Sequence, residues 1–342
     1  MSTVDLRPEG SGESPWGGWR RSASLAGILV ACLVLAFFYV AGDDEPDLQP
    51  PVSPTTVADG TTPTTPGDAR KGLVYLALGD SLSRGVQPDG AKTLKNGYPR
   101  ILLKNLRPQV KPAPVLVEAG CGGATTESMI VGGKACAPDA PIPYANENRS
   151  SSQLLWAVDQ LRLRKDLPTL VTLTIGGNDI TSCVDPSAEK VDACLAEAAP
   201  RLKANWTTIA RRLRAVAGPK TVLAVMTTYD PVLGYLRISG GKDGQAAKAF
   251  HRQVVRRINP IMRRVFTKYD WKIADLAFAM HENGQIENGN ARAVAAVCSL
   301  TWACGNFDVH LNDQGYAVAA DVLEASVIDP VLAATGASSA GG

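Results

Sequence analysis

Leu73-Val74-Tyr75-Leu76-Ala77-Leu78 leads directly into Gly79-Asp80-Ser81-Leu82, and this junction of an apolar run with a polar motif decides the fold. A short apolar run that ends at a turn signal is typical of a strand buried on both faces, as in a parallel sheet. Open α/β sheets bind ligands at the carboxyl ends of their strands. Ser81, just past such an end, is therefore a candidate nucleophile, and a serine that caps the next helix is the alternative.

Apolar runs alternate with amphipathic stretches from Gly72 to about Ala334, a pattern typical of a mostly parallel sheet covered by helices. The expected strands are Leu73–Leu78, Pro114–Glu118, Leu170–Ile175, Thr221–Met226 and Trp271–Leu276. The expected helices are Tyr98–Leu106, Gln153–Arg164, Leu195–Val216, Gln245–Lys268 and Asp313–Val327. Pro260 inside the fourth helix predicts a kink or a break. Together these elements suit one α/β domain.

An apolar segment precedes this domain. Ser22 to Gly42 is a run of 21 residues without a charge, which is long enough to cross a bilayer. Arg20 and Arg21 precede the run, and the first charges after it are acidic, so the amino terminus is expected inside the cell. The alternatives are a signal peptide cleaved near Gly42 and a lipoprotein anchored at Cys32. All three interpretations export the rest of the chain.

The segment after the apolar run is dense in Pro, Thr and acidic residues and has almost nothing apolar to bury, which predicts a disordered stalk. We therefore expect five parts along the chain. They are a cytoplasmic tail over residues 1–21, a transmembrane helix over 22–42, a linker over 43–70, a folded domain over 71–334 and a flexible tail over 335–342.

Seven cysteines are present, and all but Cys32 follow the apolar segment. Exported cysteines favour disulfide bonds. The six fall into sequence-close pairs, which predicts the bonds Cys121–Cys136, Cys183–Cys194 and Cys298–Cys304. None has the spacing of a zinc knuckle, so no metal site is expected. The net charge of +2, with both signs interspersed, gives no electrostatic case for binding nucleic acid.

Further chemistry-bearing residues follow the other strands. The chain has three histidines, and His310 lies in a loop just before the last helix, where it can reach a strand end as a general base. His251 and His281 are most simply solvated. Gly123 in a glycine-rich turn and Asn178 after the third strand offer N–H donors for an oxyanion, with tight-turn roles as the alternative.

Four motifs in this order resemble the conserved blocks of the SGNH hydrolases, the GDSL family of esterases and lipases. They are Gly79-Asp80-Ser81-Leu82, Glu118 to Thr126, Gly176-Gly177-Asn178-Asp179 and Asp308 to Tyr316. The resemblance, closest to secreted actinobacterial members, implies a three-layer α/β/α fold with a mostly parallel five-stranded sheet, flavodoxin-like in arrangement.

The same resemblance implies an ester hydrolase that needs no cofactor, in which Ser81 is the nucleophile and His310 the base. The oxyanion hole would be formed by the N–H groups of Ser81 and Gly123 and the amide of Asn178. The expected partners are an ester substrate, either a lipid or an acylated glycan, and the membrane. The chain is expected to be a monomer. An envelope acyltransferase with the same acyl-enzyme and a non-catalytic binding module are the alternative functions.

The histidine motif departs from the family pattern. Phe307 stands three residues before His310, where relatives usually have aspartate, and Asp308 lies two before it. A neutral imidazole needs a partner on its second nitrogen to fix the tautomer. The Phe307 carbonyl and the Asp308 carboxylate are the two candidates, and we favour the carbonyl, which makes the expected machinery a Ser-His dyad.

The charge pattern around the apolar segment generates a test of location. Full-length protein should partition with membranes, and proteolysis in the linker should release a folded domain from the outer face, because the segment is long enough to remain as an anchor. Membrane fractionation followed by amino-terminal sequencing checks this. Soluble native protein that begins near Asp43 would show a cleaved signal peptide instead.

Overall fold

The structure is a computed structural model that describes residues 72–88, 93, 95–133, 152–238, 244–282 and 291–337. Five strands form one sheet in the order β2-β1-β3-β4-β5, and all four neighbouring pairs are parallel. Their bounds are β1 Val74–Gly79, β2 Val115–Glu118, β3 Thr169–Thr174, β4 Thr221–Met226 and β5 Lys272–Ala274. The predicted parallel sheet is therefore confirmed, and each strand lies within about two residues of its expected range.

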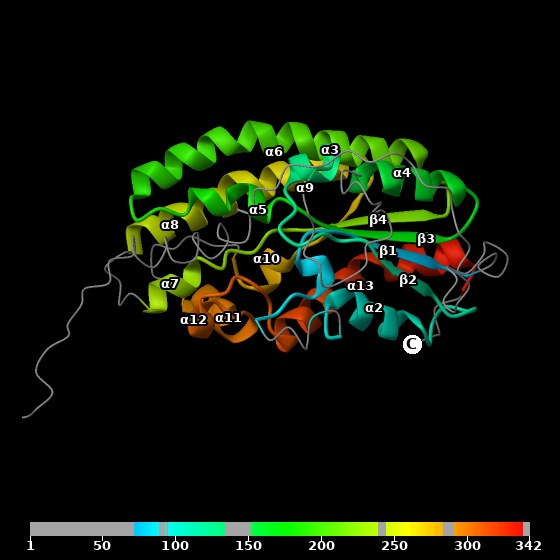
Figure 1. The fold of residues 1–342 in the computed structure, drawn as a ribbon. Helices are drawn as coiled ribbons and strands as arrows, with labels where there is room; N and C mark the ends of the chain where they lie inside the picture. The colour runs from blue at the N-terminus through cyan, green and yellow to red at the C-terminus, as the bar shows by residue number, and fades with distance from the viewer. Residues whose placement is uncertain are drawn as a thin grey trace, which may run out of the picture. The chain divides into compact units, whose positions relative to one another are not determined.

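Alternate side chains of the strands enter two separate apolar cores, one on each face of the sheet. Leu76 and Leu78 of β1 join Val171 of β3 in one core, whereas Tyr75 and Ala77 join the other. Helices cover both faces (Figure 1). The first face is covered by α3 (Thr126–Val131), α4 (Gln153–Leu163), α6 (Ala188–Val216), α8 (Gly244–Gln253) and α9 (Asn259–Lys268), and the second by α2 (Tyr98–Leu106), α10 (Leu276–Ala279) and α13 (Asp313–Thr335). Burial on both faces explains the nearly continuous apolar runs of β1 and β4, while β3 also buries three threonines. The fold is the expected three-layer α/β/α arrangement.

The longer helices match the expected ones in position but not always in length. They are α2 Tyr98–Leu106, α4 Gln153–Leu163, α6 Ala188–Val216, α8 Gly244–Gln253, α9 Asn259–Lys268 and α13 Asp313–Thr335. Helix α6 begins seven residues earlier than predicted, where the Ser187 hydroxyl caps the N–H of Lys190. Helix α13 continues beyond Val327 and through Pro330.

The interruption predicted at Pro260 takes the form of a change in helical winding. A five-residue π segment, Val254–Ile258, separates α8 from α9 and ends two residues before the proline. Because Pro260 has no N–H, the carbonyl of Arg256 lacks its usual donor there, and π segments accommodate such gaps.

Several short helices were missed by the sequence analysis. They are α3 Thr126–Val131, α5 Gly177–Ile180, α7 Leu233–Ile238, α10 Leu276–Ala279, α11 Ala291–Leu300 and α12 Ala303–Asn306. Helices α7, α11 and α12 share a small apolar cluster of their own, formed by Leu233, Ala293, Val297 and Ala303. None of the helices in the described residues is both long and apolar enough to cross a bilayer. The predicted transmembrane segment and linker lie outside the described residues.

Gly79 ends β1 in a conformation that only glycine adopts readily. Its φ is +123°, and a Cβ at this position would lie 1.9 Å from the carbonyl oxygen of Thr174 on β3. The Gln153 side chain binds both sides of the Gly79 peptide, since its Oε1 accepts the Gly79 N–H at 2.6 Å and its Nε2 donates to the carbonyl at 3.0 Å. The strand end is thus fixed from two directions.

This close approach predicts that Gly79→Ala strongly destabilises the domain. Left-handed strain and the clash with the Thr174 carbonyl should together lower the free energy of unfolding by on the order of 3 kcal/mol or more. Gly177→Ala is the matched control, because nothing lies within 4 Å of its Cβ position. Urea denaturation of both variants measures the difference. Equal midpoints for the two variants would contradict the prediction.

Candidate active site

The carboxyl ends of β1, β3 and β4 open onto one pocket. Ser81 follows β1, Asn178 follows β3 and Tyr229 follows β4, and all three line the pocket together with His310. Its remaining walls are largely apolar, with Ile175, Ile180, Val184, Val232 and Phe250 among them. The structure therefore brings together three residues that the sequence analysis singled out, although they lie as far apart in the chain as positions 81 and 310.

Ser81 occupies the first position after the turn at the end of β1. It precedes a 3-10 turn, Leu82–Arg84, and its carbonyl accepts N–H bonds from Arg84 and Val86 at 3.1 and 3.2 Å. Its hydroxyl makes no capping hydrogen bond to that turn. The alternative interpretation of Ser81 as a cap is therefore wrong, and Ser81 lies in the pocket lining.

The second ring nitrogen of His310 is held by Asp308. Nδ1 lies 2.6 Å from Asp308 Oδ1, and the same oxygen accepts the backbone N–H of His310 at 2.7 Å. Phe307 adopts a left-handed conformation with φ 54°, which turns the chain just before this contact. Aspartate readily accepts a backbone N–H two residues on, so a shift of one position still places a carboxylate at the ring. The structure thus favours the carboxylate over the Phe307 carbonyl that we preferred from sequence.

The ionisation of Asp308 is determined by its contact with His310. Burial raises the pKa of Asp308, but the hydrogen bond from His310 and its charge outweigh burial, and the net pKa is lowered. Asp308 is therefore ionised at neutral pH. A carboxylate on Nδ1 favours the tautomer with its proton there, which leaves the lone pair on Nε2.

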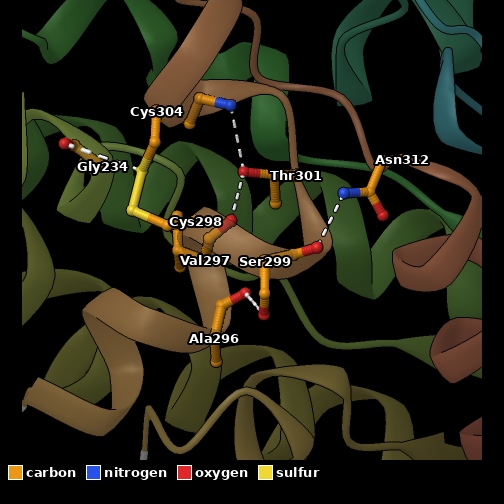
Figure 2. The surroundings of a disulfide bond; sticks show 9 residues. Gly234, Ala296, Val297, Cys298, Ser299, Thr301, Cys304 and Asn312 are labelled. Atoms are coloured by element: carbon orange, nitrogen blue, oxygen red, sulfur yellow. Dashed lines mark hydrogen bonds between the residues drawn. A yellow bond between two sulfur atoms is a disulfide. The ribbon is translucent and has the colours of Figure 1, made fainter.

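The backbone around His310 is fastened to the segment that precedes it. Trp302 N–H donates to the His310 carbonyl at 3.0 Å, and Asn312 N–H donates to the carbonyl of Leu300 at 3.0 Å. Figure 2 shows the Cys298–Cys304 bond that closes this segment, with the Thr301 hydroxyl inside the loop bonded to the Val297 carbonyl and the Ala303 N–H. The disulfide loop thus supports the histidine loop.

Two of the predicted disulfide bonds are confirmed. Cys298–Cys304 joins α11 to α12, and Cys183–Cys194 joins the turn before α6 to its first turns. Cys121 is also disulfide-bonded, and Cys136, its predicted partner, lies outside the described residues.

The two predicted oxyanion loops contact each other directly. The Asn178 amide donates to the Ala124 carbonyl at 2.9 Å. Asp179 accepts both the backbone N–H and the hydroxyl of Thr126, at 2.8 and 2.5 Å. Gly123 has φ +70°, as its turn requires, but it is not one of the described residues that line the pocket. The structure places it beside the Asn178 loop through its neighbour Ala124.

Asp80 is a buried carboxyl that the sequence analysis left without a role. Its Oδ1 accepts the N–H of Leu82 at 3.1 Å and the hydroxyl of Thr174 at 3.0 Å, and it is 4% exposed. Burial raises its pKa from 3.8 to about 6, although these hydrogen bonds and the charge of His310 oppose the rise.

The other two histidines differ from each other. His281 is exposed, as expected. The expectation for His251 was wrong, because this residue is 1% exposed and its Nδ1 lies 3.1 Å from Asp230 Oδ2. The helical pattern placed His251 on α8 correctly, but only the tertiary structure shows that the loop after β4 covers it.

Comparison with known proteins gives one family. A sequence model of the GDSL-like lipase/acylhydrolase family matches residues 77–318, which is more than half of the chain. An extracellular lipase from Streptomyces rimosus shares 15% identity and a TM-score of 0.44, over 74% of this chain and 99% of the lipase. A two-domain esterase active on acetylated mannans shares 14% identity and a TM-score of 0.41, over 77% of this chain and 50% of the esterase. Comparison with curated proteins finds no match.

The raised pKa of Asp80 predicts a pH-dependent loss of stability. Between 3.8 and about 6 the unfolded chain releases this proton more readily than the folded one, so unfolding becomes easier as pH rises through that window. Asp80→Asn keeps an oxygen for both donors and avoids the buried charge. Relative to wild type, its free energy of unfolding should therefore rise by on the order of 2–3 kcal/mol from pH 4 to pH 7.5.

Urea denaturation across that pH range measures the effect. Asp166→Asn, at an exposed position, is the matched control and should show no such gain. If the free energies of unfolding of Asp80→Asn and wild type change in parallel from pH 4 to 7.5, the pKa of Asp80 is not raised in the folded protein.

Proposed function

Because this chain belongs to the GDSL-like lipase/acylhydrolase family, we propose that it is an exported serine esterase that hydrolyses carboxylic esters through an acyl-enzyme. One observation carries the proposal. Ser81, Asn178 and His310 line a single pocket, and His310 Nδ1 is held at 2.6 Å by the Asp308 carboxylate. A nucleophile, a base oriented by a third group, and an amide donor are the parts that acyl transfer requires.

The reaction proceeds in two halves. Ser81 Oγ attacks the ester carbonyl while His310 Nε2 takes its proton, and Asp308 stabilises the imidazolium that forms. His310 then protonates the leaving alcohol, which departs and leaves an acyl group on Ser81. Water attacks this acyl-enzyme with His310 again as the base, and the carboxylic acid leaves as Ser81 recovers its proton.

Three N–H donors would stabilise the negative charge on the carbonyl oxygen. Ser81 N–H and the Asn178 amide line the pocket, and Gly123 N–H lies on the adjoining turn, next to the Ala124 carbonyl that Asn178 contacts. Asn178 has two amide hydrogens, and its bond to the Ala124 carbonyl uses one of them. The other remains for the oxyanion. Loss of one such donor typically lowers turnover by roughly 10²–10³.

Two features support an exported enzyme acting on an ester with an apolar part. The disulfide bonds Cys183–Cys194 and Cys298–Cys304 are typical of an oxidising compartment. The pocket beside Ser81 is walled by aliphatic side chains and Phe250, which suits an acyl chain more than a sugar. We propose that the domain works outside the membrane that residues 22–42 are expected to cross.

Asp308→Asn separates a triad from a dyad. The amide presents the wrong group to Nδ1, so turnover should fall by on the order of 10³–10⁴ if the carboxylate orients His310. Ser81→Ala and His310→Ala should be nearly inactive. Initial rates on p-nitrophenyl esters from acetyl to palmitoyl, with the full-length chain, measure all three and also define the preferred acyl length.

Asp321→Asn, an exposed carboxylate on α13, is the matched control and should keep full activity. Nearly normal turnover in Asp308→Asn would return the orienting role to the Phe307 carbonyl. Activity retained by Ser81→Ala would overturn the proposed function.

A further inference from the structure

Tyr229 links the pocket wall to the histidine loop. It lies in the loop after β4, lines the pocket and is 5% exposed. Its hydroxyl donates a hydrogen bond to the carbonyl of Val309, the residue directly before His310. Burial raises the pKa of Tyr229 well above its usual value, and the charges of Asp80 and Asp308 raise it further. The hydroxyl therefore stays protonated and remains a donor.

The Tyr229 hydrogen bond is the second contact that holds the backbone at His310. Trp302 N–H holds the carbonyl of His310 from one side, at 3.0 Å, and Tyr229 holds the carbonyl of Val309 from another element. Two consecutive carbonyls fixed by different parts of the fold restrict rotation of the two peptide units that flank the His310 Cα. The direction in which the His310 side chain leaves the backbone depends on the orientation of these two units.

Asp230, the residue that follows Tyr229, belongs to a buried polar cluster with His251 and Glu282, and the three are 0%, 1% and 2% exposed. Asp230 N–H donates to both oxygens of Glu282, each at 3.0 Å, and Asp230 Oδ2 lies 3.1 Å from His251 Nδ1. Its Oδ1 accepts the N–H of Val232 at 2.9 Å. The cluster joins the β4 loop to α8 and to the turn after α10.

The polar cluster is costly to bury, which argues that it serves more than general packing. Burial raises the pKa of Asp230, and burial together with the nearby Asp230 raises that of Glu282 well above its usual value. Among the described residues, Nε2 of His251 has no hydrogen-bond partner. Replacement of such groups by apolar residues of similar size is often neutral or stabilising. The presence of this polar cluster is therefore better explained by a need to fix the geometry of the loop after β4 than by stability.

We propose that Tyr229 is a positioning residue for His310, and that the polar cluster of Asp230, His251 and Glu282 holds Tyr229 in place. The inference rests on the proposed role of His310 as the base. It assigns no chemical step to Tyr229, whose hydroxyl acts on His310 through the Val309 carbonyl. Its contribution is to keep Nε2 of His310 aimed at Ser81.

Tyr229→Phe tests the proposal because it removes one hydroxyl and keeps the ring. Turnover should fall by about 10-fold or more with KM within about twofold, since misplacement of the base slows the chemistry rather than binding. Tyr75→Phe is the matched control, because it removes another buried hydroxyl, bonded to Thr172 at 2.9 Å within the sheet. It should leave turnover within about twofold of wild type. Normal turnover in Tyr229→Phe overturns the proposal.

A double-mutant cycle tests the role of the polar cluster. His251→Leu should lower turnover as Tyr229→Phe does, whereas His251→Asn, which keeps an N–H for Asp230, should restore most of it. If the cluster acts through Tyr229, the double variant Tyr229→Phe/His251→Leu loses no more than the stronger single variant. Losses that multiply would show independent effects and refute the linkage.

A spectroscopic measurement keeps this inference separate from the proposed function. The chain has three histidines, so ring signals of histidine-labelled protein can be assigned by single substitutions. Tyr229→Phe should shift the His310 ring signals and leave those of His281 unchanged, with Tyr75→Phe as control. If wild type hydrolyses no ester, the proposed function fails while this readout still decides the position of His310. An unmoved His310 signal contradicts the inference.

Discussion

The close approach of β1 and β3 at Gly79 is the constraint on which the rest of the site depends. Only a residue without a side chain leaves room for the Thr174 carbonyl there, and the Gln153 amide then fixes both sides of the peptide. The Asp80 N–H donates to that same carbonyl at 2.9 Å, so Ser81 emerges at a defined point on the sheet edge. The position of the Ser81 backbone is thus set by the contacts of the two residues that precede it.

Beneath the pocket, this protein buries carboxyl groups in places where apolar residues would cost less. Asp80 directly precedes Ser81 and also lines the pocket, and Asp230 and Glu282 belong to the polar cluster next to Tyr229. The raised pKa values of all three show that their ionised forms are disfavoured by burial. Such groups are typical of sites where geometry and charge are maintained at the expense of stability.

Much of the fold could be predicted from the sequence, because strands buried on both faces appear as continuous apolar runs and their motifs follow in order. The position of Ser81 after the first strand, and its grouping with His310, were predicted from the same apolar runs and the motifs that follow them. The sequence could not show that His251 is buried against Asp230, since a helical period does not identify what covers each face. From sequence we preferred the Phe307 carbonyl, whereas the structure favours Asp308, because the left-handed turn at Phe307 is not visible in the sequence. Tyr229 carries no motif at all.

The loop closed by Cys298–Cys304 makes the seating of His310 sensitive to the compartment in which the chain resides. Both large apolar cores form around the sheet and do not include this bond. In a reducing cytosol the domain would therefore still form both cores, but without the disulfide the loop that carries the Trp302–His310 contact would be less constrained. Oxidation to the disulfide would restore that constraint, so the orientation of His310 would depend on the redox state around the domain.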